Sequence, residues 1–180
     1  MTRRIVNMID IEATGLNEPE QRIIEHCSML YDLDTEEHIK TFVWRCNPMR
    51  KIEPKAQKAH GIRLDDLANE PTFDAIAPLI RGTIDTAYAC VAHNGDHYDF
   101  DFLTRECRRV GHPVTFNRTF DTMVNGRFAN PLGKIPRLGE LAECLDVDYD
   151  PEKAHGAEYD VSVMAACFFA GRKLGWFILP

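Results

Sequence analysis

The sequence Arg4-Ile-Val-Asn-Met-Ile-Asp-Ile-Glu-Ala-Thr-Gly-Leu16 decides how the rest of the chain is arranged. Its apolar side chains occupy nearly every position up to residue 11, which predicts a strand covered on both faces and therefore central in a sheet. Asp10 and Glu12 are set into the end of this strand, and Thr14-Gly15 breaks it. Residues two apart in a strand point to the same face, so we expect the two carboxylates to project side by side.

Two carboxylates so close together have two physical explanations. Like charges at that distance are costly unless a cation lies between them or one of them is protonated. Oxygen ligands of this kind suit a hard divalent ion such as Mg²⁺ or Mn²⁺. The alternative is a strand that runs out into a solvated acidic turn, and this stretch alone leaves both explanations open.

Length and composition predict one domain over residues 1–180, because 44% hydrophobic residues suffice for a substantial core. No apolar run is long enough to span a bilayer, and polar residues interrupt the N-terminal segment where a secretory signal would be apolar. The six cysteines are scattered without C-x-x-C spacing, which is typical of reduced core thiols. We therefore expect a cytoplasmic protein with no membrane association.

The net charge of −7 argues at first against a nucleic-acid partner. Metal-ligating carboxylates would account for part of that charge, so the overall balance decides little. Basic residues gather locally between residues 50 and 63 and again between residues 105 and 109. An ordinary solvated face explains each group as well as a phosphate-binding surface does.

The order of elements predicts an α/β domain. Strands over residues 22–33 and 38–46 follow the opening strand after short turns, which predicts an antiparallel meander. Helical and strand patterns then alternate, with strands expected over 86–92 and 115–121 and helices over 98–110, 122–128, 137–145 and 157–174.

Two further carboxylates stand where helices begin. Asp99 opens the helix after a His-Asn-Gly turn, and Asp160 lies in the first turn of the last helix. Each has a structural explanation as a favourable charge at a helix N-terminus. His155 lies five residues before Asp160, and Gly156 favours a helix that begins after His155. A histidine on such a loop suits a general base near neutral pH.

Taken together, these segments resemble the DnaQ-like 3′–5′ exonucleases of the DEDDh class. Asp10-x-Glu12-x-Thr14-Gly15 is similar to the first motif of that family, Ala92-His93-Asn94-Gly95 with Tyr98-Asp99 to the second, and His155-x-Ala157-x-x-Asp160 to the third. Segments at residues 23–25, 60–62 and 71–73 resemble the family's spacers. Each motif is short, but their common order along nearly the whole chain is specific.

The resemblance implies a ribonuclease H-like fold with a mixed five-stranded sheet flanked by helices. It implies a two-metal-ion mechanism that releases nucleoside 5′-monophosphates, in which two Mg²⁺ or Mn²⁺ ions are held by Asp10, Glu12, Asp99 and Asp160 and His155 is the general base. The implied contacts to the terminal nucleotide come from the residues after the first strand, from the second motif and from one spacer: Ala13, Thr14, Gly15, Leu16, His60, Asn94 and Tyr98.

The second motif has three residues between Asn94 and Tyr98, which makes it most similar to the three-prime repair (Trex) exonucleases. That likeness suggests a homodimer as one arrangement, although the sequence itself carries no signature for it. A stand-alone nuclease acting on single-stranded DNA 3′ ends is the favoured interpretation, since no polymerase-binding tail follows the last motif. Alternatives are a proofreading subunit of a DNA polymerase, an exoribonuclease, and a non-catalytic single-strand-binding module.

Overall fold

A computed structural model describes residues 3–16, 18–154 and 156–179. Its centre is a five-stranded sheet in the order β3-β2-β1-β4-β5, with the opening stretch as the middle strand. Strands β1, β2 and β3 pair antiparallel, whereas β4 and β5 run parallel to β1. The mixed sheet, the meander and the central place of β1 confirm the predictions from sequence. The strands are β1 (Ile5–Ala13), β2 (Ile23–Asp32), β3 (His38–Arg45), β4 (Ala89–Ala92) and β5 (Thr119–Asp121).

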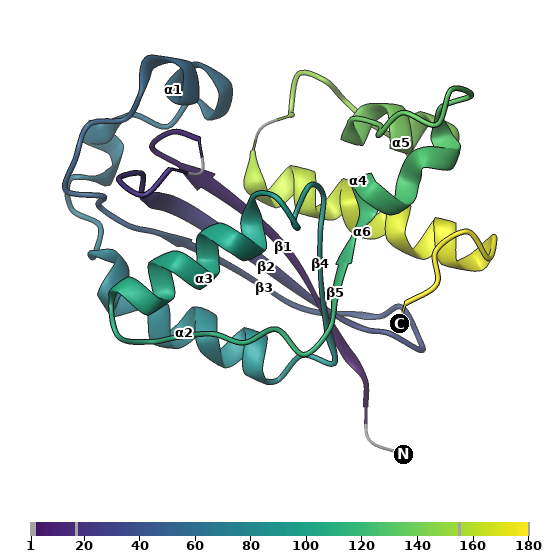
Figure 1. The fold of residues 1–180 in the computed structure, drawn as a ribbon, viewed down its shortest axis with the longest axis horizontal. Coiled ribbons are helices and arrows are strands. Elements are labelled where there is room, and N and C mark those ends of the chain that lie inside the picture. Colours follow the sequence, from purple (N-terminus) through teal and green to yellow (C-terminus); the bar gives the residue numbers. More distant parts are fainter. Residues whose placement is uncertain (1–2, 17, 155, 180) are drawn as a thin grey trace.

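Helices cover both faces of the sheet (Figure 1). Side chains of α2 and α3 form one hydrophobic core with Ile9 and Ile11 of β1. Side chains of α5 and α6 form the other with Val6 and Met8. The alternation along β1 therefore feeds two cores, which explains why its apolar residues are almost continuous. The helices and 3₁₀ turns are α1 (Pro54–His60), η1 (Leu64–Leu67), α2 (Phe73–Asp85), α3 (Asp99–Arg109), α4 (Thr122–Asn125), η2 (Gly126–Ala129), α5 (Leu138–Cys144) and α6 (Ala157–Lys173).

Element ends differ from the sequence-based boundaries by more than one residue at three places. The strand expected over 86–92 begins at Ala89, and the strand expected over 115–121 is limited to Thr119–Asp121. The helix expected over 122–128 is split into α4 and η2 at Gly126. The two short strands are defined by pairing of β4 with β1 and of β5 with β4, which local pattern does not encode.

Cysteine burial agrees with the predicted core role. Five of the six thiols are buried, and Cys144 is exposed at the end of α5. Within the described residues, no helix combines the length and the apolar character that crossing a bilayer requires.

Candidate active site

Asp10 and Glu12 lie near the end of β1 and follow Met8 on the face that α6 covers. Both side chains are largely shielded from water. Burial first, and then the negative charges of Asp99 and Glu12, hold the pKa of Asp10 well above its usual range. Burial and the charges of Glu25, Asp160 and Asp99 raise the pKa of Glu12 to about 8. The two carboxylates at this strand end are therefore stabilised by bound protons or by a bound cation.

Asp99 is the first residue of α3 and is only 2% exposed. Its Oδ1 accepts a hydrogen bond of 3.1 Å from the Ile11 backbone N–H, which ties the start of α3 to the end of β1. Burial raises the pKa of Asp99 to about 7 in spite of that bond. A carboxylate that serves only as a helix cap is normally solvated, so this burial favours a role in the site.

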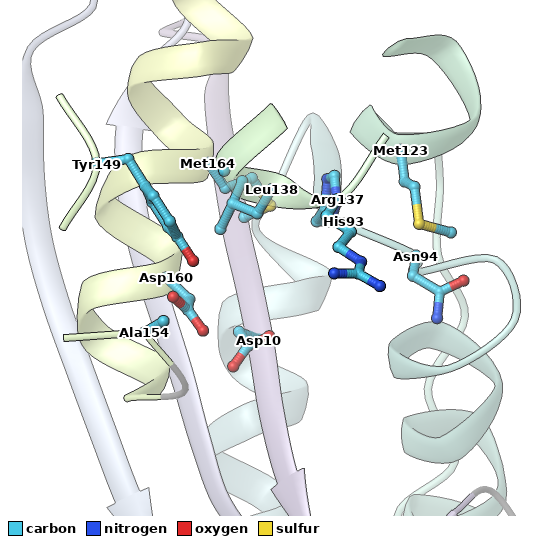
Figure 2. Close-up of a pocket in the computed structure, with 11 residues that line it drawn as sticks. Asp10, His93, Asn94, Met123, Arg137, Leu138, Tyr149, Ala154, Asp160 and Met164 are labelled. Atoms are coloured by element: carbon cyan, nitrogen blue, oxygen red, sulfur yellow. The ribbon is translucent and has the colours of Figure 1, made fainter. Parts of the chain in front are cut away.

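Asp160 lies in the first turn of α6 and faces Asp10 across a pocket (Figure 2). Its charge contributes to the raised pKa of both Asp10 and Glu12. His155, the predicted general base, lies outside the described residues. The acidic residues predicted from three separate motifs are therefore brought together at one end of β1.

This donor set fits hard divalent cations, because buried carboxylates that repel one another are stabilised by positive charge between them. Among the described side chains, no group of three or more His, Cys, Asp or Glu is placed so that it could hold a metal ion as it stands. Binding of ions by Asp10, Glu12, Asp99 and Asp160 would therefore involve rotation of side chains toward a shared centre.

The residues after β1 form a floor beside the carboxylates. The Thr14 hydroxyl donates to Gln21 Oε1 over 2.6 Å, and the Tyr98 hydroxyl donates to the Gly15 carbonyl over 3.1 Å. A Cβ on Gly15 would lie 2.7 Å from the end of the Gln21 side chain, so a larger residue here would displace that amide. Leu16 is 73% exposed, in contrast to the buried Ala13 and Thr14. The Leu16 side chain is therefore accessible to a ligand.

The loop of the second motif is held by Asp121. Its carboxylate accepts from the backbone N–H groups of Asn94 and Asp96, both at 3.1 Å, and from Met123 and Val124 at 2.8 and 3.1 Å. These bonds fix Asn94 in the left-handed region with φ of 71°. Asp121 thus has a structural role in holding this loop.

His60 lies at the end of α1, a helix that is joined to the floor by the hydrogen bond of 2.8 Å from the Glu53 N–H to the Thr14 carbonyl. Its Nδ1 accepts from the Ile62 N–H at 3.0 Å. His60 does not line the pocket between Asp10 and Asp160.

That pocket, of about 510 Å³, also contains residues that the motifs did not indicate. Arg137 extends into it near His93 and Asn94, and the Tyr149 hydroxyl points toward Asp160 (Figure 2). A Cβ on Gly139 would lie 2.6 Å from the Tyr149 ring, so glycine allows the ring to lie against α5. A signal for Arg137 did exist, since a cation at a helix N-terminus opposes the helix dipole.

Comparison with known proteins identifies the family. The sequence model described as Exonuclease (RNase_T) matches residues 8–168. The chain belongs to this exonuclease family. One relative is the DNA polymerase III subunit epsilon of Rickettsia typhi, which is 30% identical over 91% of this chain and 72% of its own length. The DNA polymerase III PolC-type of Ureaplasma parvum is 30% identical over 89% of this chain, which spans only 11% of that protein. The 3′-5′ exonuclease DinG of Bacillus subtilis is 28% identical over 93% of this chain and 18% of its own length.

Solved structures agree on the fold of this exonuclease chain. Exonuclease I superposes with a TM-score of 0.79 at 17% identity, covering 95% of this chain and 41% of that one. Escherichia coli exonuclease I in complex with a dT13 oligonucleotide gives a TM-score of 0.77 over 96% of this chain and 43% of that one, at 17% identity. The DnaQ-like resemblance and the ribonuclease H-like α/β fold predicted from sequence are thereby confirmed.

Proposed function

We propose that this chain is a metal-dependent 3′–5′ exonuclease that releases nucleoside 5′-monophosphates from single-stranded DNA. The observation that carries the proposal is the convergence of Asp10, Glu12, Asp99 and Asp160 from β1, α3 and α6. Their mutual repulsion is tolerable only with protons or cations between them. Family membership supports the reaction class.

Two divalent ions held by these carboxylates would lower the pKa of an attacking water and neutralise charge on the phosphate that is cleaved. His155, placed by sequence five residues before Asp160, accepts the proton of that water. The water oxygen bonds to phosphorus, and the bond from phosphorus to the 3′ oxygen of the preceding nucleotide breaks. The terminal nucleotide leaves with its 5′-phosphate, and the 3′ oxygen takes up a proton.

The floor supports the choice of a free 3′ end. Leu16 and Tyr98 offer apolar and aromatic surface beside Asp10, and contact of this kind holds a base of any identity. Unpaired ends expose the base for such contact. Exonuclease I, which shares the fold, has been solved with single-stranded oligonucleotides, and this supports the same substrate class.

The test is digestion of a 5′-labelled single-stranded DNA, the same strand in a duplex, and the corresponding RNA, each with Mg²⁺, with Mn²⁺ and with EDTA. We expect stepwise shortening from the 3′ end, fastest for single-stranded DNA, and no product in EDTA. Faster digestion of RNA would favour the exoribonuclease alternative. Tight binding without product in Mn²⁺ would favour the non-catalytic module.

A proofreading role is a second candidate, because relatives include DNA polymerase III subunit epsilon from Rickettsia typhi and Pasteurella multocida. This candidate keeps the chemistry and adds a polymerase as partner. Co-purification with a DNA polymerase from the source cells would support it, whereas a homodimer alone in sedimentation would favour a stand-alone enzyme.

A further inference from the structure

Two surfaces of different chemistry adjoin the carboxylates. One is the floor formed by Thr14, Gly15 and Leu16 with Tyr98. The other is the pocket of about 510 Å³ that Arg137 enters, and none of the floor residues lines it. The floor is uncharged, whereas the pocket brings a cation within the same cleft as Asp10 and Asp160 (Figure 2).

Arg137 is the sole cationic side chain among the described residues that line this pocket. Its side chain approaches the backbone of Glu140 at the start of α5, and among the described residues no carboxylate forms an ion pair with its guanidinium. Its backbone N–H donates to Glu140 Oε2 over 2.8 Å, so the main chain is fixed while the side chain is available. A guanidinium has donors placed for bidentate binding of a phosphate.

The polarity of the reaction decides which phosphate this is. When the terminal nucleotide lies on the floor, its 5′-phosphate lies at the carboxylates. The bond that breaks joins that phosphate to the 3′ oxygen of the preceding nucleotide, which must therefore lie on the other side of the carboxylates. The preceding nucleotide carries its own 5′-phosphate farther from the reaction centre, where the pocket contains Arg137.

We infer that this pocket is the subsite for the penultimate nucleotide and that Arg137 binds the 5′-phosphate of that nucleotide. Met123 and Leu138 supply an apolar wall for its sugar and base. The inference rests on the proposed exonuclease function. It predicts that the enzyme distinguishes a longer strand from a substrate that ends at the leaving group.

Three substrates separate the subsite from the chemistry. The first is a single-stranded DNA oligonucleotide. The second is the same oligonucleotide with an uncharged methylphosphonate at the linkage preceding the one that is cleaved. The third is the p-nitrophenyl ester of thymidine 5′-monophosphate, in which p-nitrophenol replaces the preceding nucleotide. The variants are Arg137→Gln and Arg137→Lys, with Lys134→Gln as control, because Lys134 is an exposed cation of the same segment that does not line the pocket.

For Arg137→Gln we expect kcat/KM on the oligonucleotide to fall about 10- to 100-fold, the range for a hydrogen bond to a charged group. The loss on the ester should be at least tenfold smaller. The methylphosphonate should lower kcat/KM of the native enzyme by a similar factor but have little further effect on Arg137→Gln, and Arg137→Lys should recover part of the loss. In binding measured by fluorescence anisotropy with EDTA, the slope of log affinity against log salt should decrease by about 0.7, the value for one phosphate contact on a single strand.

Equal losses on oligonucleotide and ester, or an equal effect of the methylphosphonate on native and Arg137→Gln enzymes, would overturn the subsite. A native enzyme that cleaves neither oligonucleotide nor ester would instead refute the proposed function. Native cleavage of the oligonucleotide with no effect of Arg137→Gln refutes the subsite alone.

Discussion

Replacing Glu12 by glutamine isolates the electrostatic cost of the carboxylate cluster. The pKa of Glu12 is raised from 4.5 to about 8, by burial first and then by Glu25, Asp160 and Asp99. The shift of about 3.5 pH units, at 1.36 kcal/mol per unit, corresponds to about 5 kcal/mol. Since Glu12 is not fully shielded, screening by water reduces the measurable effect to about 2–3 kcal/mol.

The sign follows from proton binding. The Glu12 carboxyl binds its proton more tightly in the folded protein than in the unfolded chain. The destabilisation of the fold by this carboxyl is therefore absent below pH 4.5 and grows until about pH 8. In EDTA at pH 8.5, Glu12→Gln should therefore raise the free energy of unfolding by about 2–3 kcal/mol. At pH 5 the variant and the native protein should differ by less than about 1 kcal/mol.

Urea unfolding followed by circular dichroism measures both values, with Glu20→Gln as the control at an exposed position. Addition of Mg²⁺ at pH 8.5 should stabilise the native protein more than Glu12→Gln, because the ion replaces the missing proton. If Glu12→Gln is stabilising to the same extent at pH 5 and pH 8.5, or is not stabilising in EDTA, the repulsion argument is refuted.

Three other predictions follow from particular contacts. His155→Ala should lower kcat about 10²- to 10⁴-fold while Mg²⁺ still raises the melting temperature; an unchanged kcat excludes the histidine as base. Gly95→Ala should destabilise the fold by about 1–3 kcal/mol, because its Cβ would lie 2.6 Å from both Ala92 Cβ and the Phe100 ring. The control Gly82→Ala, which has open space around it, should not destabilise the fold. Urea unfolding midpoints compare the two variants. Burial lowers the pKa of His26 to about 3, so protons bind the unfolded chain more tightly and destabilise the fold below about pH 6.5. His26→Gln should therefore reduce the slope of unfolding free energy against pH between pH 6 and 4 by up to one proton. An unaltered slope would show that His26 titrates normally.

The sequence predicted the centre of the fold because β1 has to satisfy two cores at once. Val6 and Met8 pack on one side and Ile9 and Ile11 on the other, and the resulting apolar run is visible without any structure. The parallel strands were predicted less well, because β5 contributes only three residues and is defined by its pairing with β4. The local sequence pattern locates a strand whose own side chains are continuously buried. It does not locate a short strand whose limits are set by pairing with a neighbouring strand.

The carboxylates could be predicted for a similar reason. Asp10 and Glu12 are charges inside an apolar strand, and such a placement is costly without a function. Asp99 has an ordinary helix-start position in sequence, and only its 2% exposure and the bond from Ile11 distinguish it from a solvated cap. The order of the motifs therefore indicated the role of Asp99 in the site. The structure supplies the physical reason, because it shows that this carboxylate is buried.

Apart from its unfavourable charge at the start of a helix, nothing in the hydrophobic periodicity or the motif order indicates Arg137. It lies 127 residues after Asp10, between an irregular segment and the short helix α5, and nothing apolar or periodic marks it. The fold brings it to the carboxylates because α5 packs on α6, the helix that carries Asp160. Glu140 in the first turn of α5 accepts the Arg137 backbone N–H over 2.8 Å and complements the helix dipole. The guanidinium forms no ion pair with a carboxylate of the described residues, so a phosphate of the substrate strand in this pocket is the counter-charge that the proposed subsite provides.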